Sequence, residues 1–308
     1  MTRCRVRHAA LAEVRKVPDR ADRRSAPALF DHIGPVARFH SSRDFERSAN
    51  MTSSLSITTS GHVQTWTIDK QDVGNAITGT DFIEAFEQAV DGANRDLDVR
   101  AIVLTGAGRI FSAGGNVKEM ADRQGMFGLD PRHQRRAYVN SIQRIPRALE
   151  RLEVAIIAAV NGPAVGAGCD LAMMCDVRIA SDRAVFAESF VSIGLIPGDG
   201  GTWFLPRAIG YERAALMTFT GERIDAATAK EWNLVSTLVP HDELLSAATG
   251  IAERIAANPS ESLRMAKRLL QESRTGALES VLGMAAAMQP LAHLDPEHEH
   301  RLDRWRSK

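Results

Sequence analysis

Two segments of the sequence each join a short apolar run, a turn of small residues and the start of a helix. The first turn lies in residues 111–120, FSAGGNVKEM, and the second in residues 161–171, NGPAVGAGCDL, where a helix is expected to begin near Ala167. Small residues let a ligand approach the backbone closely, and the first turn of a helix presents N–H groups that lack intrahelical partners. Two such turns can direct one N–H group each at a single oxygen atom, which predicts an oxyanion hole. The alternative is that both are tight packing turns.

Nucleotide-binding loops fit the sequence poorly. Residues 105–108, TGAG, follow an apolar run, but the third glycine of a dinucleotide loop is replaced by Phe111. The sequence has no Gly-Lys-Ser or Gly-Lys-Thr step for a phosphate loop. We therefore do not expect a nucleotide-binding fold of either kind.

The spacing of apolar residues predicts an α/β core from residue 55 onward. Residues 55–59 and 63–68 read as a hairpin, and residues 81–93 as an amphipathic helix. Further short strands are expected at residues 100–105, 154–160 and 176–180. After about residue 208 we expect helices only, at residues 212–219, 226–232, 242–257 and 260–273, with Asp225 and Ser260 as caps of the second and fourth.

Composition narrows the classes of partner and compartment. Lys and Arg total 38, as do Asp and Glu, so the whole chain has no net positive charge that would favour binding to nucleic acid or to an anionic membrane. Three cysteines without zinc-ligand spacing indicate a reducing compartment, which we take as cytoplasmic. Residues 154–175 are apolar and nearly long enough to span a bilayer, but Asn161-Gly162-Pro163 and Asp170 interrupt them. A buried strand, a turn and a buried helix fit that run better.

Residues 1–50 differ from the rest of the chain. They contain ten Arg and one Lys against six acidic residues, and they show no sustained helical or strand period. We expect a disordered extension, or upstream sequence joined by a misassigned start, because Met51 directly precedes the regular elements. A targeting leader and a basic nucleic-acid-binding arm are the alternatives.

Several motifs together resemble the crotonase superfamily, also called the enoyl-CoA hydratase/isomerase family. The resemblance covers about residues 55–275. The matching segments are residues 75–77 (NAI), 111–120, 161–176, 194–201 (GLIPGDGG), 205–210 (LPRAIG) and 266–267 (AK).

The resemblance implies an α/β fold, a spiral of ββα units followed by a helical C-terminal region that mediates trimerisation. It divides the chain into an extension at residues 1–50, a crotonase-like core at 51–210 and a C-terminal helical region at 211–308. The implied partners are an acyl-CoA substrate and further copies of the chain, as a homotrimer or dimer of trimers. No cofactor is implied beyond the coenzyme A thioester that serves as substrate. His298-Glu299-His300, in a polar terminal stretch, is not expected to bind a metal.

Carried over position by position, the resemblance places the oxyanion-hole amides at Gly115 and Ala167. Lys118 either meets a phosphate of coenzyme A or is a solvated helix lysine. The residues expected to contact the substrate or coenzyme A are Asn75, Ala76, Ile77, Ala113, Gly114, Asn116, Lys118, Gly166, Phe190, Pro197 and Gly198.

Enolate chemistry also needs a group that moves a proton. Hydratases of the family commonly use two glutamates, and the first of these positions is Asp170, in an apolar helix start. The second position is Phe190, which cannot exchange protons, so a two-glutamate hydration is in doubt. Glu188 and Asp199 are the nearby carboxylates that can act as partner of Asp170. The alternatives are a helix-start Asp170, a surface Glu188 and a plain turn Asp199.

The expected activity is therefore that of an enoyl-CoA hydratase/isomerase, which stabilises a thioester enolate and adds water to a 2-enoyl-CoA or shifts its double bond. The missing glutamate at Phe190 favours an isomerase or a relaxed hydratase. A non-catalytic acyl-CoA-binding protein on the same fold is the alternative, and Asp170 counts against it.

Overall fold

The computed structural model describes residues 54–306, so the predicted extension at residues 1–50 lies outside the described residues. The strands are β1 Leu55–Ser60, β2 Val63–Ile68, β3 Ala101–Gly106, β4 Ala155–Val160, β5 Pro163–Val165, β6 Val177–Ser181, β7 Val185–Ala187, β8 Arg223–Asp225 and β9 Thr237–Val239. The α-helices are α1 Thr80–Arg95, α2 Val117–Ala121, α3 Pro131–Asn140, α4 Arg144–Arg151, α5 Ala167–Met174, α6 Gly201–Ile209, α7 Tyr211–Thr220, α8 Ala226–Glu231, α9 Leu244–Ala256, α10 Ser260–Glu272, α11 Leu278–His293 and α12 Pro296–Arg306. Short 3-10 helices are η1 Gln71–Val73, η2 Gly125–Gly128, η3 Val191–Ile193 and η4 His241–Glu243.

The strands form two sheets. The larger has the order β1-β2-β3-β4-β6-β9, in which β1 and β2 are an antiparallel hairpin and every later pairing is parallel. The smaller has the order β5-β7-β8, with β5 parallel to β7 and β8 antiparallel to it. Both β4 and β5 belong to one apolar run but lie in different sheets, so the chain crosses from one sheet to the other at residues 161–162.

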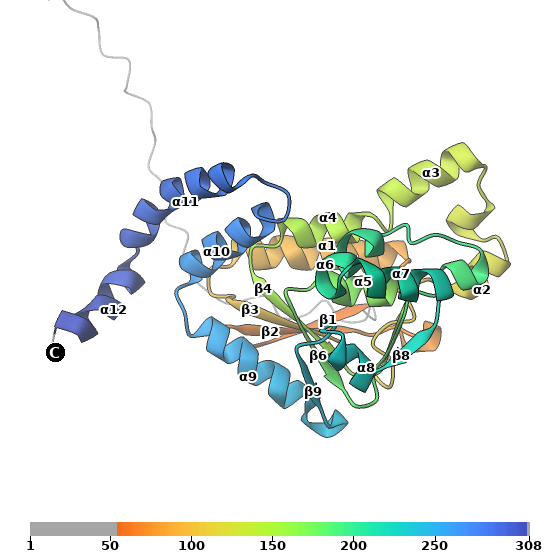
Figure 1. Ribbon diagram of the computed structural model, residues 1–308, viewed down its shortest axis with the longest axis horizontal. Coiled ribbons are helices and arrows are strands. Elements are labelled where there is room, and N and C mark those ends of the chain that lie inside the picture. The colour runs from red at the N-terminus through yellow and green to blue at the C-terminus, as the bar shows by residue number, and fades with distance from the viewer. Residues whose placement is uncertain (1–53, 307–308) are drawn as a thin grey trace, which may run out of the picture. The chain divides into compact units, whose positions relative to one another are not determined.

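Alternating side chains of β3 enter two separate cores, as the period-two geometry of a strand requires. Ile102 and Leu104 pack with residues of α1 and α4, whereas Ala101 and Val103 pack with the apolar side of α9. Figure 1 shows α9 on one side of the large sheet and α1 and α4 on the other. Because both faces are covered, every residue of β3 is buried.

The expected strands and the helices of the core are confirmed, with small shifts at their ends. The apolar run at residues 154–175 forms β4, β5 and α5 rather than one helix, as the Asn-Gly-Pro break predicts. Within residues 54–306, no helix combines the length and the apolar character that crossing a membrane requires.

Two expectations for the C-terminal part are wrong. Strands do not stop near residue 208, because β8 pairs with β7 and β9 pairs with β6. Both are only three residues long, too short for an alternation that sequence can reveal. Asp225 caps α8 as expected, through the Thr228 N–H, but Ser260 does not cap α10, since its hydroxyl donates to the Leu97 carbonyl at 2.9 Å.

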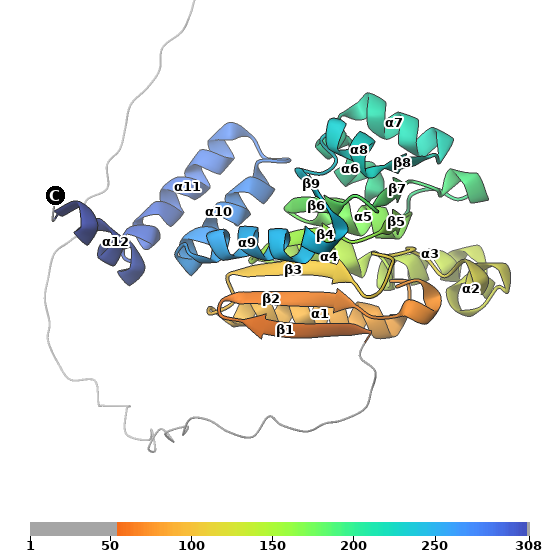
Figure 2. The same cartoon turned by 90° about the horizontal axis from the view of Figure 1, so that it is seen from below.

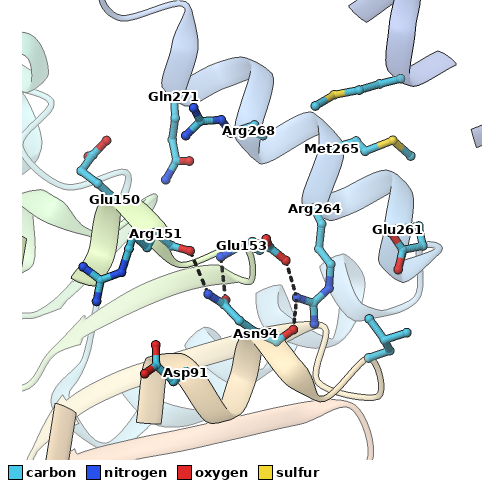
Figure 3. Close-up of a pocket in the computed structure, with 12 residues that line it drawn as sticks. Asp91, Asn94, Glu150, Arg151, Glu153, Glu261, Arg264, Met265, Arg268 and Gln271 are labelled. Carbon is cyan, nitrogen blue, oxygen red and sulfur yellow. Dashed lines mark hydrogen bonds and ion pairs between the residues drawn. The ribbon is translucent and has the colours of Figure 1, made fainter. Parts of the chain in front are cut away.

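Helix α10 is anchored to the core by two nearly buried cations, Arg264 and Lys267, and the ammonium of Lys267 donates to the Val154 carbonyl at 2.7 Å and pairs with Asp176. The guanidinium of Arg264 donates to the carbonyls of Ala93, Asn94 and Asp96 at the end of α1, and it pairs with Glu153 at 3.1 Å. Figure 3 shows this side chain directed from α10 toward Asn94 and Glu153. These bonds satisfy carbonyls that a helix end leaves without intrahelical partners. Helix α11 runs beside α10 in both Figures 1 and 2, but none of its side chains is buried.

Candidate functional site

The two glycine-rich turns lie against each other. Ser112 forms a parallel bridge with Ala164, and its carbonyl accepts a hydrogen bond from the N–H of Val165 at 3.0 Å. A Cβ atom on Gly114 would lie 2.8 Å from the amide nitrogen of Ala167. The backbone of the first turn therefore approaches the start of α5 more closely than any residue with a side chain allows.

The amides of Gly115 and Ala167, which the sequence predicts to form an oxyanion hole, face the same cavity and lack acceptors in the described part of the protein. Both residues line one cavity of about 40 Å³. Neither amide donates a hydrogen bond to any other described residue, whereas the neighbouring amides of Gly114 and Gly166 donate to Ser112 Oγ and to the Ala187 carbonyl. Because Ala167 is the first residue of α5, its N–H also lies at the positive end of the helix dipole.

Asn75 and Asn116 fix the segments on either side of the first glycine-rich turn through their side chains. Asn75 is fully buried with a φ of 56°, and its amide group donates to the carbonyls of Ala107 and Ile110. Asn116 caps α2 by accepting from the N–H groups of Lys118 and Glu119. The side chains and the backbone groups of both asparagines are therefore engaged by the protein itself, which fixes the segments that carry them.

The three carboxyl groups expected to handle protons come together from three different elements. Asp170 lies in the first turn of α5, Glu188 directly follows β7, and Asp199 precedes α6. All three are buried, and their charges influence one another. Of the three, Asp199 lines the cavity that contains Gly115 and Ala167. The interpretations of Glu188 as a surface residue and of Asp199 as an exposed turn residue do not fit this burial.

Burial is the largest influence on each of these carboxyl groups. It raises the pKa of Asp170 well above its usual value, and the negative charges of Glu188 and then Asp199 raise it further. Burial raises the pKa of Glu188 to about 7, and burial also raises that of Asp199. Three carboxylates cannot all carry charge in one dry site, because like charges and desolvation both favour the protonated forms.

The missing hydrogen-bond donors around the cluster lead to the same conclusion. No described N–H or O–H group donates to either oxygen of Asp170 or of Glu188. A hydrogen bond from a protonated Asp170 to Glu188 or to Asp199 supplies one of these missing donors, and such a bond lowers the pKa of the carboxyl group that accepts it. Burial and the neighbouring negative charges therefore favour a proton on Asp170, whereas hydrogen bonds from Asp170 favour the charged forms of Glu188 and Asp199.

Gly201 makes room for Asp170. Its Cβ position is taken by the carboxyl group of Asp170, whose Cγ would be 2.7 Å away. Phe190 packs over Gly166 and lines the cavity, so the position where the family's second glutamate is expected contributes an apolar wall. Cys169 is buried, and burial followed by the charge of Glu188 raises the pKa of its thiol, so it remains an unreactive small residue.

The cavity has further walls that the sequence analysis missed. Tyr138 of α3 lines it, and burial and then the charge of Asp199 raise the pKa of the phenol. Sequence gives little signal for this, since α3 has no buried residue and no apolar stripe. The other missed lining residues are Thr78, Met120, Met126, Phe127, Ile142, Leu195 and Ile196.

The expected contact residues divide into two groups. Phe190 and Gly198 line the cavity, as do Gly115, Ala167 and Asp199. Lys118 is exposed on α2. The expected contacts that do not line this cavity are Asn75, Ala76, Ile77, Ala113, Gly114, Asn116, Lys118, Gly166 and Pro197.

A larger cavity of about 630 Å³ lies between α10 and the helices α1 and α4 (Figure 3). Its arginines are largely satisfied by the protein, since Arg264 pairs with Glu153 and Arg268 with Glu272. It shares no residue with the turns or the carboxyl cluster. Among the residues that the structure describes, no group of three His, Cys, Asp or Glu side chains is arranged to hold a metal ion.

Comparison with known proteins agrees with this geometry. Residues 58–298 match the family described as enoyl-CoA hydratase/isomerase. A probable mitochondrial enoyl-CoA hydratase of Dictyostelium discoideum is 38% identical over 213 residues, which cover 69% of this chain and 73% of that protein. The 2,3-dehydroadipyl-CoA hydratase of Escherichia coli K12 is 32% identical over 234 residues, covering 76% and 88%.

The fold is shared with solved structures. The crystal structure of an enoyl-CoA hydratase from Bacillus anthracis superposes with a TM-score of 0.76 at 31% identity, over 82% of this chain and 96% of that one. The sequence resemblance, the contact between the two glycine-rich turns and the superposition thus agree. The chain belongs to the enoyl-CoA hydratase/isomerase family, and its fold is the crotonase fold.

Proposed function

We propose that this chain catalyses double-bond chemistry on an enoyl-CoA thioester, with the amides of Gly115 and Ala167 stabilising the enolate oxygen. The observation that carries the proposal is that both amides lack an acceptor and line the same cavity as a buried carboxyl group, Asp199. Two N–H groups preset for a developing oxyanion act on the transition state more strongly than on the ground state.

Asp199 is the carboxyl group that exchanges a proton with the acyl chain, because it is the member of the cluster that lines the cavity. Asp170, protonated, and Glu188 lie behind it and set its charge state. In an isomerisation, Asp199 takes a proton from Cα of a 3-enoyl thioester. The resulting dienolate is held at its oxygen by the two amides, and the proton returns to Cγ to give the 2-enoyl thioester.

The apolar ring of Phe190 favours double-bond shift over hydration. Hydration requires an acid and a base arranged around a water molecule, whereas isomerisation runs with one carboxylate that takes a proton and returns it. A phenyl group in the wall offers no hydrogen bond to such a water. Hydration is the competing activity, because relatives that are 32–39% identical to this chain are named as hydratases.

A non-catalytic acyl-CoA-binding protein is the second candidate. Three buried carboxyl groups argue against it, because each costs desolvation free energy that a binding protein has no reason to retain.

The test compares turnover of trans-3-hexenoyl-CoA and of crotonyl-CoA by the full chain and by Asp199→Asn and Asp170→Asn. We expect 2-hexenoyl-CoA to form faster than crotonyl-CoA is hydrated, and each variant to lose at least about 10²-fold in kcat. Faster hydration of crotonyl-CoA would assign the chain as a hydratase. No turnover of either thioester, together with tight acyl-CoA binding, would support the non-catalytic alternative.

We also propose that the chain assembles as a trimer through its C-terminal helices. Helix α11 has no buried residue, and it carries three leucines, Leu278, Leu282 and Leu291, that are each more than half exposed. Such a helix is more apolar than solvent exposure explains. Light scattering should give the mass of three chains, or of six, and Leu282→Glu with Leu291→Glu should lower it. A monomeric wild-type chain would contradict the proposal.

A further inference from the structure

A second cavity, of about 650 Å³, opens at the carboxyl end of the large sheet. Its walls come from the segments that follow four consecutive parallel strands. Arg109 follows β3, Pro163 follows β4, Arg183 follows β6 and His241 follows β9. In open α/β sheets, ligands bind where such carboxyl-end segments meet. This cavity shares no lining residue with the one that contains Gly115 and Ala167.

Positive charge gathers in this cavity without compensation. Neither Arg109 nor Arg183 has a side-chain hydrogen bond or ion pair with another residue in the described range 54–306. No acidic side chain within that range lines the cavity. The cavity of Figure 3 differs, because its Arg264 and Arg268 are paired with glutamates. Both arginines are exposed, so their guanidinium groups carry N–H donors that no acceptor in the described range occupies and that an anion can use.

His241 supplies a third donor. Its Nδ1 atom is buried and has no hydrogen-bond partner among the described residues. The ring therefore has a nitrogen left over for a ligand, and either nitrogen of a neutral imidazole can carry the donated proton. The imidazole thus retains an N–H group that can serve a ligand in the cavity.

We propose that this cavity binds a phosphate monoester, with Arg109, Arg183 and His241 donating to the phosphate group. Planar guanidinium groups match the paired oxygens of a phosphate. The apolar walls from Ile110 and Pro163, and a volume far larger than a phosphate ion, accommodate an organic group attached to it. The ligand is therefore bound through its phosphate and held along its apolar part, at a place separate from the thioester site.

Isothermal titration of the full chain with adenosine 5′-monophosphate, inorganic phosphate and adenosine tests this proposal. We expect the monophosphate to bind more tightly than inorganic phosphate, and adenosine not to bind. Arg109→Gln and Arg183→Gln should each weaken monophosphate binding roughly 10- to 100-fold, as expected for loss of a charge-assisted bond. The matched control is Arg223→Gln on β8, an exposed arginine outside this cavity, which should bind as wild type.

The titration is repeated with saturating butyryl-3′-dephospho-CoA, a saturated thioester that offers no double bond for reaction and carries no phosphate monoester of its own. Monophosphate binding that persists assigns it to a site other than the thioester site. Binding abolished by butyryl-3′-dephospho-CoA, binding unchanged in both arginine variants, or no binding of any phosphate would each overturn the proposal. Inorganic phosphate binding as tightly as the monophosphate would overturn the role given to the apolar walls.

Discussion

Replacing Gly114 with alanine tests the oxyanion hole without changing any side chain that handles protons. The new Cβ would lie 2.5 Å from the Val165 carbonyl oxygen and 2.8 Å from the Ala167 nitrogen, where ordinary contact begins near 3.4 Å. The two turns must therefore separate by several tenths of an ångström, and the Ala167 amide must move. Losing one oxyanion donor costs roughly 10²–10³-fold in kcat, which is about 2.7–4 kcal/mol of transition-state stabilisation.

A second cost comes from the backbone. Gly114 has a φ of 80°, a region where an L side chain costs about 1–2 kcal/mol of folding free energy. Gly61→Ala is the matched control, because Gly61 has a φ of 56° and no atom within 4 Å of its Cβ position. Both variants should lose stability in urea unfolding, but only Gly114→Ala should lose turnover.

The assay is steady-state turnover of the thioester that the wild-type chain converts faster, with kcat and KM measured separately. We expect the fall to be mainly in kcat, since the amides bind the developing oxyanion rather than the ground-state carbonyl. If Gly114→Ala kept kcat within threefold of Gly61→Ala, the assignment of the Ala167 amide would be refuted.

Three further results are expected. Gly201→Ala should displace the Asp170 carboxyl group and lower kcat roughly 10²-fold. The control is Gly250→Ala, which should leave kcat unchanged because no atom lies within 4 Å of the Cβ position of Gly250. Equal kcat values for the two variants would contradict the packing of Gly201 against Asp170. The pKa of Glu188 is raised from 4.5 to about 7 in the folded chain. As the pH rises, the unfolded chain therefore releases this proton at a lower pH than the folded chain does. The free energy of unfolding falls by about 3 kcal/mol between pH 4.5 and pH 7 for this reason. Urea titrations should show that Glu188→Gln loses this part of the fall, and identical pH profiles would disprove it. Phe190→Ala should raise kcat/KM for octenoyl-CoA relative to the crotonyl thioester, and an unchanged ratio would exclude Phe190 as an acyl-chain wall.

The core and the two turns could be predicted from sequence because their signals are local. The run IVLT at residues 102–105 and the run at residues 155–160 are apolar enough to be buried strands whatever surrounds them. Small residues at 112–115 and 162–168 mark close backbone approach in any fold. What they could not indicate is that Ser112 pairs with the segment at Ala164, since that contact depends on how two sheets meet.

The carboxyl cluster was only partly predictable. Asp170 stands out because it interrupts an apolar run, but Glu188 and Asp199 lie in ordinary strand-end and turn sequence. Their burial results from the packing of α5, β7 and α6, which local sequence does not specify. Tyr138 was missed for the same reason, since α3 buries nothing and only its position over Gly198 brings the ring to the cavity.

The reacting groups come from segments spread between residues 115 and 199, on elements of both sheets. The first turn and α5 bring together the two amides and Asp170, but Glu188 and Asp199 come from β7 and from the segment before α6. A chain that has folded only its first hairpin and the large sheet still lacks β7 and the start of α6, and with them Glu188 and Asp199. The turnover that we propose for this chain should therefore report finished folding, and during renaturation it should return only after the bulk of the helical signal has been regained.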